Sequence, residues 1–229
     1  MNNKKQLSKE TKNLCGMAMF VALSVAVSFL TMGIKVGHLT FDAKDAIITI
    51  AAYIYGPIPG VLMSFISASI ESIISGFQTG PIGWLMDIIS SATFAFSAAM
   101  IYRHKRSFSG ALISLGGASV ILVAAMMLFN MIISPLFFPG MKPFDPAIMV
   151  DIPRLYLPFN IAKALLNSAI VMYLYKPATF ALSKAKLLDA EEKTPLTFNK
   201  KSVVIIICGL VGIIASIGIF LLTYFLNKK

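Results

Sequence analysis

The chain has 229 residues, of which 57% are hydrophobic and 13% are charged. Soluble globular domains contain roughly 45–50% apolar residues, so this composition and the mean hydropathy of +0.81 indicate a polytopic membrane protein. The formal charge of +10 requires no nucleic-acid partner, because basic residues beside membrane spans meet the anionic lipids of the inner leaflet.

Seven apolar runs can span a bilayer or nearly so: 14–34, 43–56, 58–76, 81–102, 109–137, 154–176 and 203–226. The second and third are shorter than a full crossing. The segment GPIPG at 56–60 stops one helix and starts the next, which predicts a tight helical hairpin. A polar segment of mixed charge at 181–202 is expected to be a linker.

Basic residues predict the orientation of these helices. They gather in the N-terminal segment 1–13, in the loop at 103–106 and in the linker after the sixth run. The positive-inside rule therefore places the N-terminus and the linker in the cytoplasm. The first run is too long for a secretory signal, so we expect an uncleaved first helix and a multi-pass protein of the plasma membrane.

The first run carries Ala18, Ala22 and Ala26 at intervals of four residues. Small residues at this spacing form a smooth groove that lets another helix approach closely. The spacing leaves two alternatives open, namely packing within the protein's own bundle and contact with a separate subunit.

Charged residues stand directly before the second run. Asp42 is expected to cap that helix, and Asp45 to lie in its first turn at the positive end of the helix dipole. Phe41, in the same loop as Lys44, could close over a ligand.

The third and fourth runs each have a polar side. Ser64, Ser67, Glu71 and Ser75 form a stripe on the third run, and Glu71 is a natural partner for Lys163. Asp87 is interpreted as a first-turn acid of the fourth run, on one side with Ser90 and Ser91.

The strongest functional signal lies in the sixth run. At about 100° per residue, Asn160, Lys163 and Asn167 fall on one narrow face. A lysine near the middle of a spanning helix costs about 2.5–3.5 kcal/mol on insertion scales and faces a bundle interior or a wet cavity. We interpret Lys163 as the floor of a polar pocket, to which Asn130 of the fifth run adds an amide. The alternative is an ion pair that only locks two helices together.

Several kinds of chemistry are not expected. Cys15 and Cys208 do not suggest a disulfide framework, and His38 and His104 lie in different loops, so we expect no metal site. No phosphate loop, HExxH or GxSxG motif is present, so the chain is not expected to be an enzyme or to bind ATP itself. The last run has no ionisable residue and predicts a peripheral helix that faces lipid.

Five segments together resemble the substrate-binding S component of energy-coupling factor (ECF) vitamin transporters. They are LPFNIAK at 157–163, LFNMIISPLF at 128–137, FDAKDA at 41–46, YGPIPG at 55–60 and QTGPIG at 78–83. The resemblance covers roughly residues 14–180 and is greatest to the riboflavin-specific branch.

The resemblance implies an all-α membrane protein of a bacterial cell, with a six-helix substrate-binding domain at 14–180. The helix within 203–229 is then an addition that places the C-terminus outside. The vitamin is bound from outside as a transported ligand and not as a cofactor, and a transmembrane coupling subunit with two ATPase subunits drives uptake. The ligand contacts expected are Asn130, Asn160, Lys163, Asn167, Phe41, Lys44 and Thr79. The contacts expected with the coupling subunit are Ala18, Ala22 and Ala26.

Three alternatives remain at this point. The chain could be an S component for another vitamin or small heterocycle. It could be a self-sufficient secondary carrier, although no internal repeat is evident. It could also be an intramembrane enzyme that uses Lys163 and Glu71 as base and acid, although no nucleophile motif accompanies them.

Overall fold

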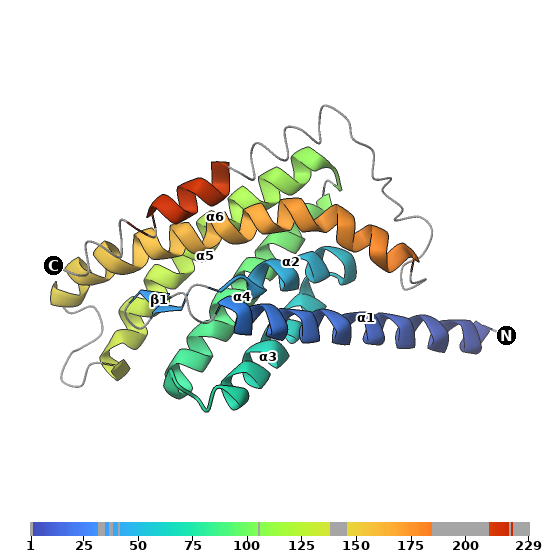
Figure 1. Ribbon diagram of the computed structural model, residues 1–229, viewed down its shortest axis with the longest axis horizontal. Helices are drawn as coiled ribbons and strands as arrows, with labels where there is room; N and C mark the ends of the chain where they lie inside the picture. The colour runs from blue at the N-terminus through green and yellow to red at the C-terminus, as the bar shows by residue number, and fades with distance from the viewer. Residues whose placement is uncertain are drawn as a thin grey trace.

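The computed structural model describes residues 2–31, 35–36, 39–40, 42–104, 106–137, 146–184, 211–219 and 221. Within these residues the chain forms a helical bundle (Figure 1). Its helices are α1 (Asn2–Thr31), α2 (Lys44–Tyr55), α3 (Pro57–Ile74), α4 (Gly80–His104), α5 (Phe108–Phe137) and α6 (Pro146–Lys184). Residues 211–219 are also helical.

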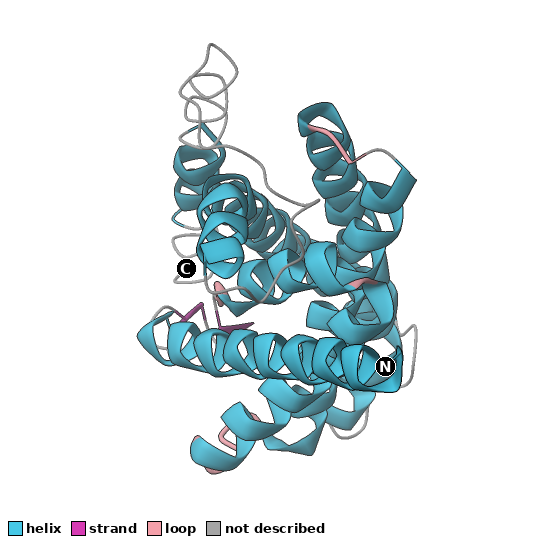
Figure 2. Ribbon diagram, turned by 90° about the vertical axis from the view of Figure 1, so that its right-hand side faces the viewer, coloured by secondary structure: helices cyan, strands magenta, loops and turns pink. Residues whose placement is uncertain are grey.

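The predicted all-α fold class is confirmed for the described residues, with one small addition. Two strands of two residues each, β1 (Lys35–Val36) and β2 (Leu39–Thr40), pair antiparallel after α1. Figure 2 shows these strands in magenta beside an otherwise helical molecule. Lys35 pairs with Thr40 and Val36 with Leu39, so the loop between α1 and α2 folds back on itself.

The first six predicted runs each coincide with a helix, and the predicted hairpin is confirmed. α2 ends at Tyr55 and α3 begins at Pro57, with Gly56 between them at φ 106°. Gly60 then lets the two helices approach closely, because a Cβ atom at this position would lie 2.6 Å from the Cβ of Ala52. Of the seventh run, residues 211–219 and 221 are described, and the rest lies outside the described residues.

Helix α2 is the centre of the bundle. It packs against α1, α3, α4 and α6, and every residue from Lys44 to Tyr53 is buried. A helix that is apolar nearly all round must be enclosed by other elements, which explains why this short run lacks a polar face. The two ends of α2 therefore fix how the surrounding helices meet.

Three tyrosines hold the C-terminal end of α2. The rings of Tyr53 and Tyr102 stack with centroids 4.2 Å apart, and Tyr175 meets both rings edge-on. The hydroxyl of Tyr102 donates to that of Tyr175 over 3.2 Å. These contacts join α2, α4 and α6 at one end of the bundle, and charged residues join them at the other.

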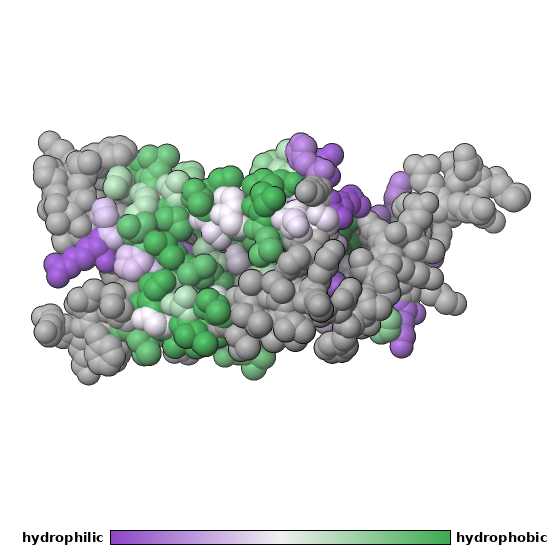
Figure 3. All heavy atoms as spheres, turned by 90° about the horizontal axis from the view of Figure 1, so that it is seen from above, coloured by the Kyte–Doolittle hydropathy of each residue, from purple (hydrophilic) through white to green (hydrophobic). Residues whose placement is uncertain are grey.

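Most of the bundle surface suits a lipid environment. Five helices in the described part of the chain are long and apolar enough to cross a membrane, and these are all the labelled helices except α2. Figure 3 shows hydrophobic residues across the middle of one face, with hydrophilic residues toward its two ends. With 12 residues, α2 is shorter than the roughly 20 that a full crossing needs. The protein is therefore a multi-pass membrane protein.

Candidate ligand-binding site

The polar face predicted for α6 lies inside the bundle. Asn160, Lys163 and Asn167 are buried, with 2%, 6% and 1% of their surfaces exposed. The Lys163 Nζ atom lies 3.0 Å from Asp45 Oδ2 and donates to Ser90 Oγ over 3.2 Å. Lys163 therefore joins α6 to α2 and α4, which is the ion-pair arrangement that the sequence left open as an alternative.

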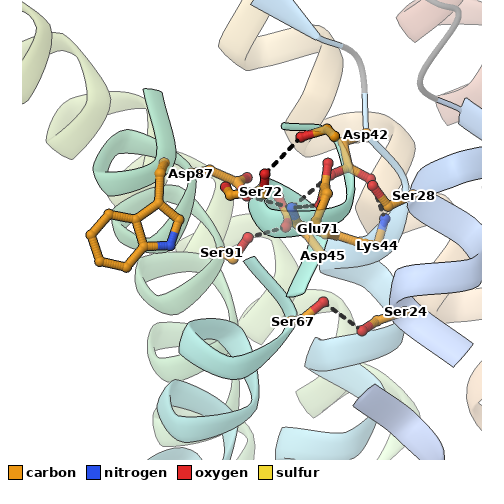
Figure 4. Close-up of polar contacts among 12 residues, drawn as sticks. Ser24, Ser28, Asp42, Lys44, Asp45, Ser67, Glu71, Ser72, Asp87 and Ser91 are labelled. Atoms are coloured by element: carbon orange, nitrogen blue, oxygen red, sulfur yellow. Dashed lines mark hydrogen bonds and ion pairs between the residues drawn. The ribbon is translucent and has the colours of Figure 1, made fainter. Parts of the chain in front are cut away.

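The predicted pair between Lys163 and Glu71 is wrong, because Glu71 meets a different cation. The ammonium group of Lys44 is fully buried and contacts the carboxylates of Glu71 and Asp87 (Figure 4). It also lies 3.1 Å from Asp42 Oδ2. Lys44 therefore ties the start of α2 to α3 and α4.

Helix α4 presents one polar side to both cations, as its spacing predicted. Asp87 contacts Lys44, Ser90 accepts from Lys163, and Ser91 donates to Asp45. Asp87 lies about two turns inside α4, so its interpretation as a first-turn acid is wrong.

The six ionisable residues of these two groups are called the charge network below: Asp42, Lys44, Asp45, Glu71, Asp87 and Lys163. In the described part of the chain, no three His, Cys, Asp or Glu side chains are arranged to hold a metal ion. The carboxylates of the network instead surround two ammonium groups.

Asp42 and Asn167 fix the beginning of α2. Asp42 is not the N-cap residue as predicted, because that position is Ala43, which forms no side-chain cap hydrogen bond. Asp42 Oδ1 nevertheless accepts from the backbone N–H of Lys44 over 2.8 Å and so satisfies one backbone donor at the helix start. Asn167 Oδ1 accepts from the backbone N–H of Ala46 over 2.9 Å, and its Nδ2 donates to the Asp42 and Lys163 carbonyl oxygens. The amide of Asn167 is thus engaged in holding α6 to α2.

The other two amides have more hydrogen-bonding capacity left. Asn130 Nδ2 donates to the Met126 carbonyl over 2.7 Å, and Asn160 Nδ2 to the Tyr156 carbonyl over 2.8 Å. Each side-chain amide carries a second N–H and a carbonyl oxygen, and an ammonium group has three donors. Asn130, Asn160 and Lys163 can therefore each offer a further polar contact.

Of the three remaining predicted contacts, Thr79 and Lys44 are among the described residues. Thr79 is exposed in the turn between α3 and α4, and its side chain packs close to Gly83. Lys44 is enclosed by its three carboxylates. Phe41 lies outside the described residues.

The alanines of α1 point away from the bundle. Ala18, Ala22 and Ala26 are exposed, whereas Phe20 and Ser24 on the same helix are buried. The hydroxyls of Ser24 and Ser67 of α3 form a hydrogen bond over 2.8 Å, so the side of α1 that bears Ser24 is the side that packs against the bundle. The interpretation that the alanines pack within this chain's own bundle is therefore wrong.

Sequence reasoning missed the central role of Asp45. It accepts from Ser91 and pairs with Lys163, and it is completely buried. A signal was present: the run that follows is apolar nearly all round, so charged residues in its first turn must be buried with it. A buried carboxylate needs a cation, and Lys163 was available.

A sequence model described as "ECF transporter, substrate-specific component" matches residues 12–175. The riboflavin transporter RibU of Staphylococcus aureus (strain TCH60) is 25% identical over 182 residues, which are 77% of this chain and 95% of that protein. The riboflavin transporter FmnP of Bacillus subtilis (strain 168) is 25% identical over 145 residues, covering 60% and 75%.

The fold is also similar to a solved structure, reported under the description "Structure and mechanism of the S component of a bacterial ECF transporter". The TM-score is 0.63 at 25% identity, with 76% of this chain and 98% of that chain covered. The chain belongs to the family of substrate-specific components of ECF transporters.

Proposed function

We propose that this chain is the riboflavin-binding S component of an ECF importer in a bacterial plasma membrane. Its N-terminus lies in the cytoplasm, and it captures the vitamin from outside. The family match and two relatives that are riboflavin transporters support this proposal. The observation that carries it is the buried polar face of α6, formed by Asn160, Lys163 and Asn167.

The chemistry of riboflavin suits the residues that keep hydrogen-bonding capacity. Its flat tricyclic ring has an imide edge that both donates and accepts, as do the amides of Asn130 and Asn160. The ammonium group of Lys163 suits a ring carbonyl or nitrogen. In this proposal Phe41 and Thr79 belong to the outer cover of the site. Lys44 acts from inside the bundle, where it and Asn167 position the start of α2.

The ion pair of Lys163 is compatible with ligand binding. Ser90 accepts from one of its three N–H donors, and Asp45 Oδ2 lies 3.0 Å from its Nζ as an ion pair without hydrogen-bond geometry, so donor capacity remains for the ligand. The same ion pair keeps the ammonium group charged and oriented within the bundle. Buried polar groups matched to a ligand also reject analogues that lack the matching edge.

Titration of the purified protein with riboflavin tests the proposal. We expect saturable binding, and we expect Asn160→Ala and Lys163→Ala to weaken it by at least about tenfold through loss of a ligand hydrogen bond. Lys12→Ala, which removes an exposed lysine of α1, is the matched control.

Asp45→Asn breaks the same ion pair but keeps the lysine, so it separates loss of the ligand contact from loss of the pair. The proposal fails if riboflavin does not bind, or if Lys163→Ala and Asn160→Ala bind it as tightly as the unchanged protein.

An S component for another small heterocycle is the second candidate, because the relatives are only 25% identical. It predicts the same bundle and the same partners with a different ligand. Competition of bound flavin by a panel of vitamins and nucleosides separates the two candidates.

Uptake requires partners in this proposal. A transmembrane coupling subunit docks on the exposed alanines of α1, and two ATPase subunits supply the energy. Residues 14–180 form the substrate-binding domain, 181–202 a cytoplasmic linker and 203–229 an additional span. Uptake by this chain without ATPase subunits would instead favour a self-sufficient carrier.

A further inference from the structure

The helical segment 211–219, called the C-terminal strap below, lies along α6 (red beside orange in Figure 1). Ser216 Oγ is buried and donates to the backbone carbonyl of Ala162 over 2.8 Å. A Cβ atom added at Gly212 would lie 3.4 Å from the Cβ of Ala169 and 3.7 Å from the carbonyl oxygen of Leu165. The two helices are therefore in contact at Gly212 and Ser216, and an added Cβ at Gly212 would already be at van der Waals distance from α6.

The order of these contacts gives the direction of the strap. Gly212 meets Leu165 and Ala169, whereas Ser216, one turn later, meets Ala162. The strap therefore runs antiparallel to α6, as expected for a chain that crosses the membrane and returns.

The strap covers the side of α6 that is opposite its polar face. At about 100° per residue, and with Asn160 at 0°, Lys163 and Asn167 fall near 300° and 340°. Three of its contact residues, Ala162, Leu165 and Ala169, fall near 200°, 140° and 180°. Ile219 of the strap also packs against the cluster of Phe159 and Ala162. The strap touches the back of the helix that presents the proposed ligand contacts.

The outer side of the strap is apolar. Val211, Ile214 and Ile217 are 60%, 68% and 51% exposed, as expected for side chains that face lipid. In a bilayer there is no hydrophobic driving force for helices to associate, because lipid tails are as apolar as the side chains. Close packing at small residues and hydrogen bonds between helices must therefore hold the helices together. Gly212 and Ser216 supply both on the side that faces α6.

We propose that Gly212 and Ser216 are positioning residues: they seat the C-terminal strap on α6 and fix the rotation at which α6 turns Asn160 and Lys163 toward the bundle interior. The strap acts through α6 and does not touch the ligand. The consequence for riboflavin affinity rests on the function proposed above, whereas the seating of the strap does not.

A cross-link tests the seating without any ligand. The test variant is the full chain with Gly212→Cys and Ala169→Cys. Its two natural cysteines are removed by Cys15→Ser and Cys208→Ser, and a protease site is inserted within 185–202. The Cβ separation of 3.4 Å is close to the roughly 3.5–4.5 Å of disulfides, so we expect oxidation to hold the cleaved fragments together on a non-reducing gel. Gly218→Cys with Ala169→Cys is the control, because Gly218 has no described atom within 4 Å of an added Cβ. Absence of the cross-link, or equal cross-linking in the control, overturns the proposal.

A matched pair of substitutions tests the positioning role. Gly212→Leu overpacks the contact with α6, whereas Gly218→Leu places the same side chain in open space. We expect Gly212→Leu to weaken riboflavin binding about tenfold in protein that is still folded by gel filtration. Gly218→Leu is expected to bind normally, and Gly212→Ala to retain most of the affinity.

Equal affinity of folded Gly212→Leu and Gly218→Leu overturns the positioning role. If the unchanged protein binds no riboflavin, the proposed function fails while the cross-link still reports on the seating of the strap. The two failures are therefore distinguishable.

Discussion

Lys44 and Asp45 are the two charged residues in the described part of the chain with 0% of their surface exposed, and Lys44 has the larger side chain. Its ammonium group has no exposed surface and contacts three carboxylates, from Asp42, Glu71 and Asp87. Removing a partner from buried charges costs about 3–5 kcal/mol, because the remaining charges are left uncompensated. The start of α2 therefore depends on this lysine for its position.

Replacing Lys44 with Met is expected to lower the free energy of unfolding by about 3–5 kcal/mol, measured as thermal unfolding in detergent. Adding Glu71→Gln and Asp87→Asn to the same variant should recover part of the loss, since two unpaired charges are then removed. Lys12→Met, on the exposed side of α1, serves as the control. A Lys44→Met protein as stable as this control would show that the carboxylates are satisfied in some other way.

Lys163 and Asp45 are expected to be coupled in a double-mutant cycle. Single substitutions Lys163→Met and Asp45→Asn each leave a buried group without its partner, so the double variant should lose less stability than their sum by about 0.5–3 kcal/mol. A parallel cycle of Lys163→Met with Glu71→Gln should give much weaker coupling, because Glu71 pairs with Lys44. Stronger coupling to Glu71 than to Asp45 would contradict the pairing found here.

At the scale of single residues, the sequence predicted which side chains are polar and buried but not which of them meet. The face of Asn160, Lys163 and Asn167 follows from helical periodicity alone. The choice between Asp45 and Glu71 as the partner of Lys163 depends on how α2, α3 and α6 are placed around one another, and periodicity contains no such information. Charge complementarity permitted either pair.

Among the elements, the α2–α3 hairpin has a close helix–helix contact at a glycine. Gly60 lies on the side of α3 that faces α2, where an added Cβ would be 2.6 Å from Ala52. Gly60→Ala is expected to lower the free energy of unfolding by about 1–3 kcal/mol, because the two backbones must separate. Thermal unfolding of the purified variant measures the change.

Gly116→Ala on α5 is the matched control for this prediction. An added Cβ at Gly116 meets no described atom within 4 Å, so the change should be neutral or should stabilise the helix by up to about 1 kcal/mol. Equal destabilisation by both substitutions would mean that loss of backbone flexibility, and not the contact with α2, accounts for the effect.

The sequence predicted correctly that each of these helices exists, but it did not predict how long they are. Apolar runs identify α1 to α6, because each of these helices has a continuous apolar stretch that is either buried or faces lipid. Helix α6 extends from Pro146 to Lys184 and includes Pro153, Pro158 and Pro177, whereas the sequence predicted a shorter run at 154–176. Prolines end helices in water, but membrane bundles tolerate them because neighbouring groups satisfy the freed carbonyls.

In the whole molecule, helix α1 has two distinct sides: one packs against the bundle and the other is exposed. Ala18→Trp or Ala22→Trp is expected to leave riboflavin affinity unchanged and to abolish uptake in cells that contain the coupling subunits, because both alanines are exposed away from the bundle. Uptake of labelled riboflavin and binding by the purified variants are measured side by side. Ala124→Trp, at an exposed position of α5, is the control and should retain uptake. Normal uptake by both α1 variants would show that the docking surface lies elsewhere.

At the scale of the molecule, composition and the distribution of basic residues were enough to predict a multi-pass membrane protein. The ordered set of short motifs was enough to predict its family, which the match at 12–175 confirms. The packing of the C-terminal strap on the back of α6 was not predicted in detail, because a segment without ionisable residues gives no sign of which helix it contacts.

The identity of the small molecule that copurifies with the protein decides whether riboflavin is its ligand. The protein is purified from cells grown with riboflavin and then denatured, and the released compound is identified by absorption spectrum and mass. We predict a yellow protein that releases riboflavin or a close flavin in near-stoichiometric amount. Release of a different heterocycle, or a colourless protein that takes up no riboflavin when it is added, would contradict this account.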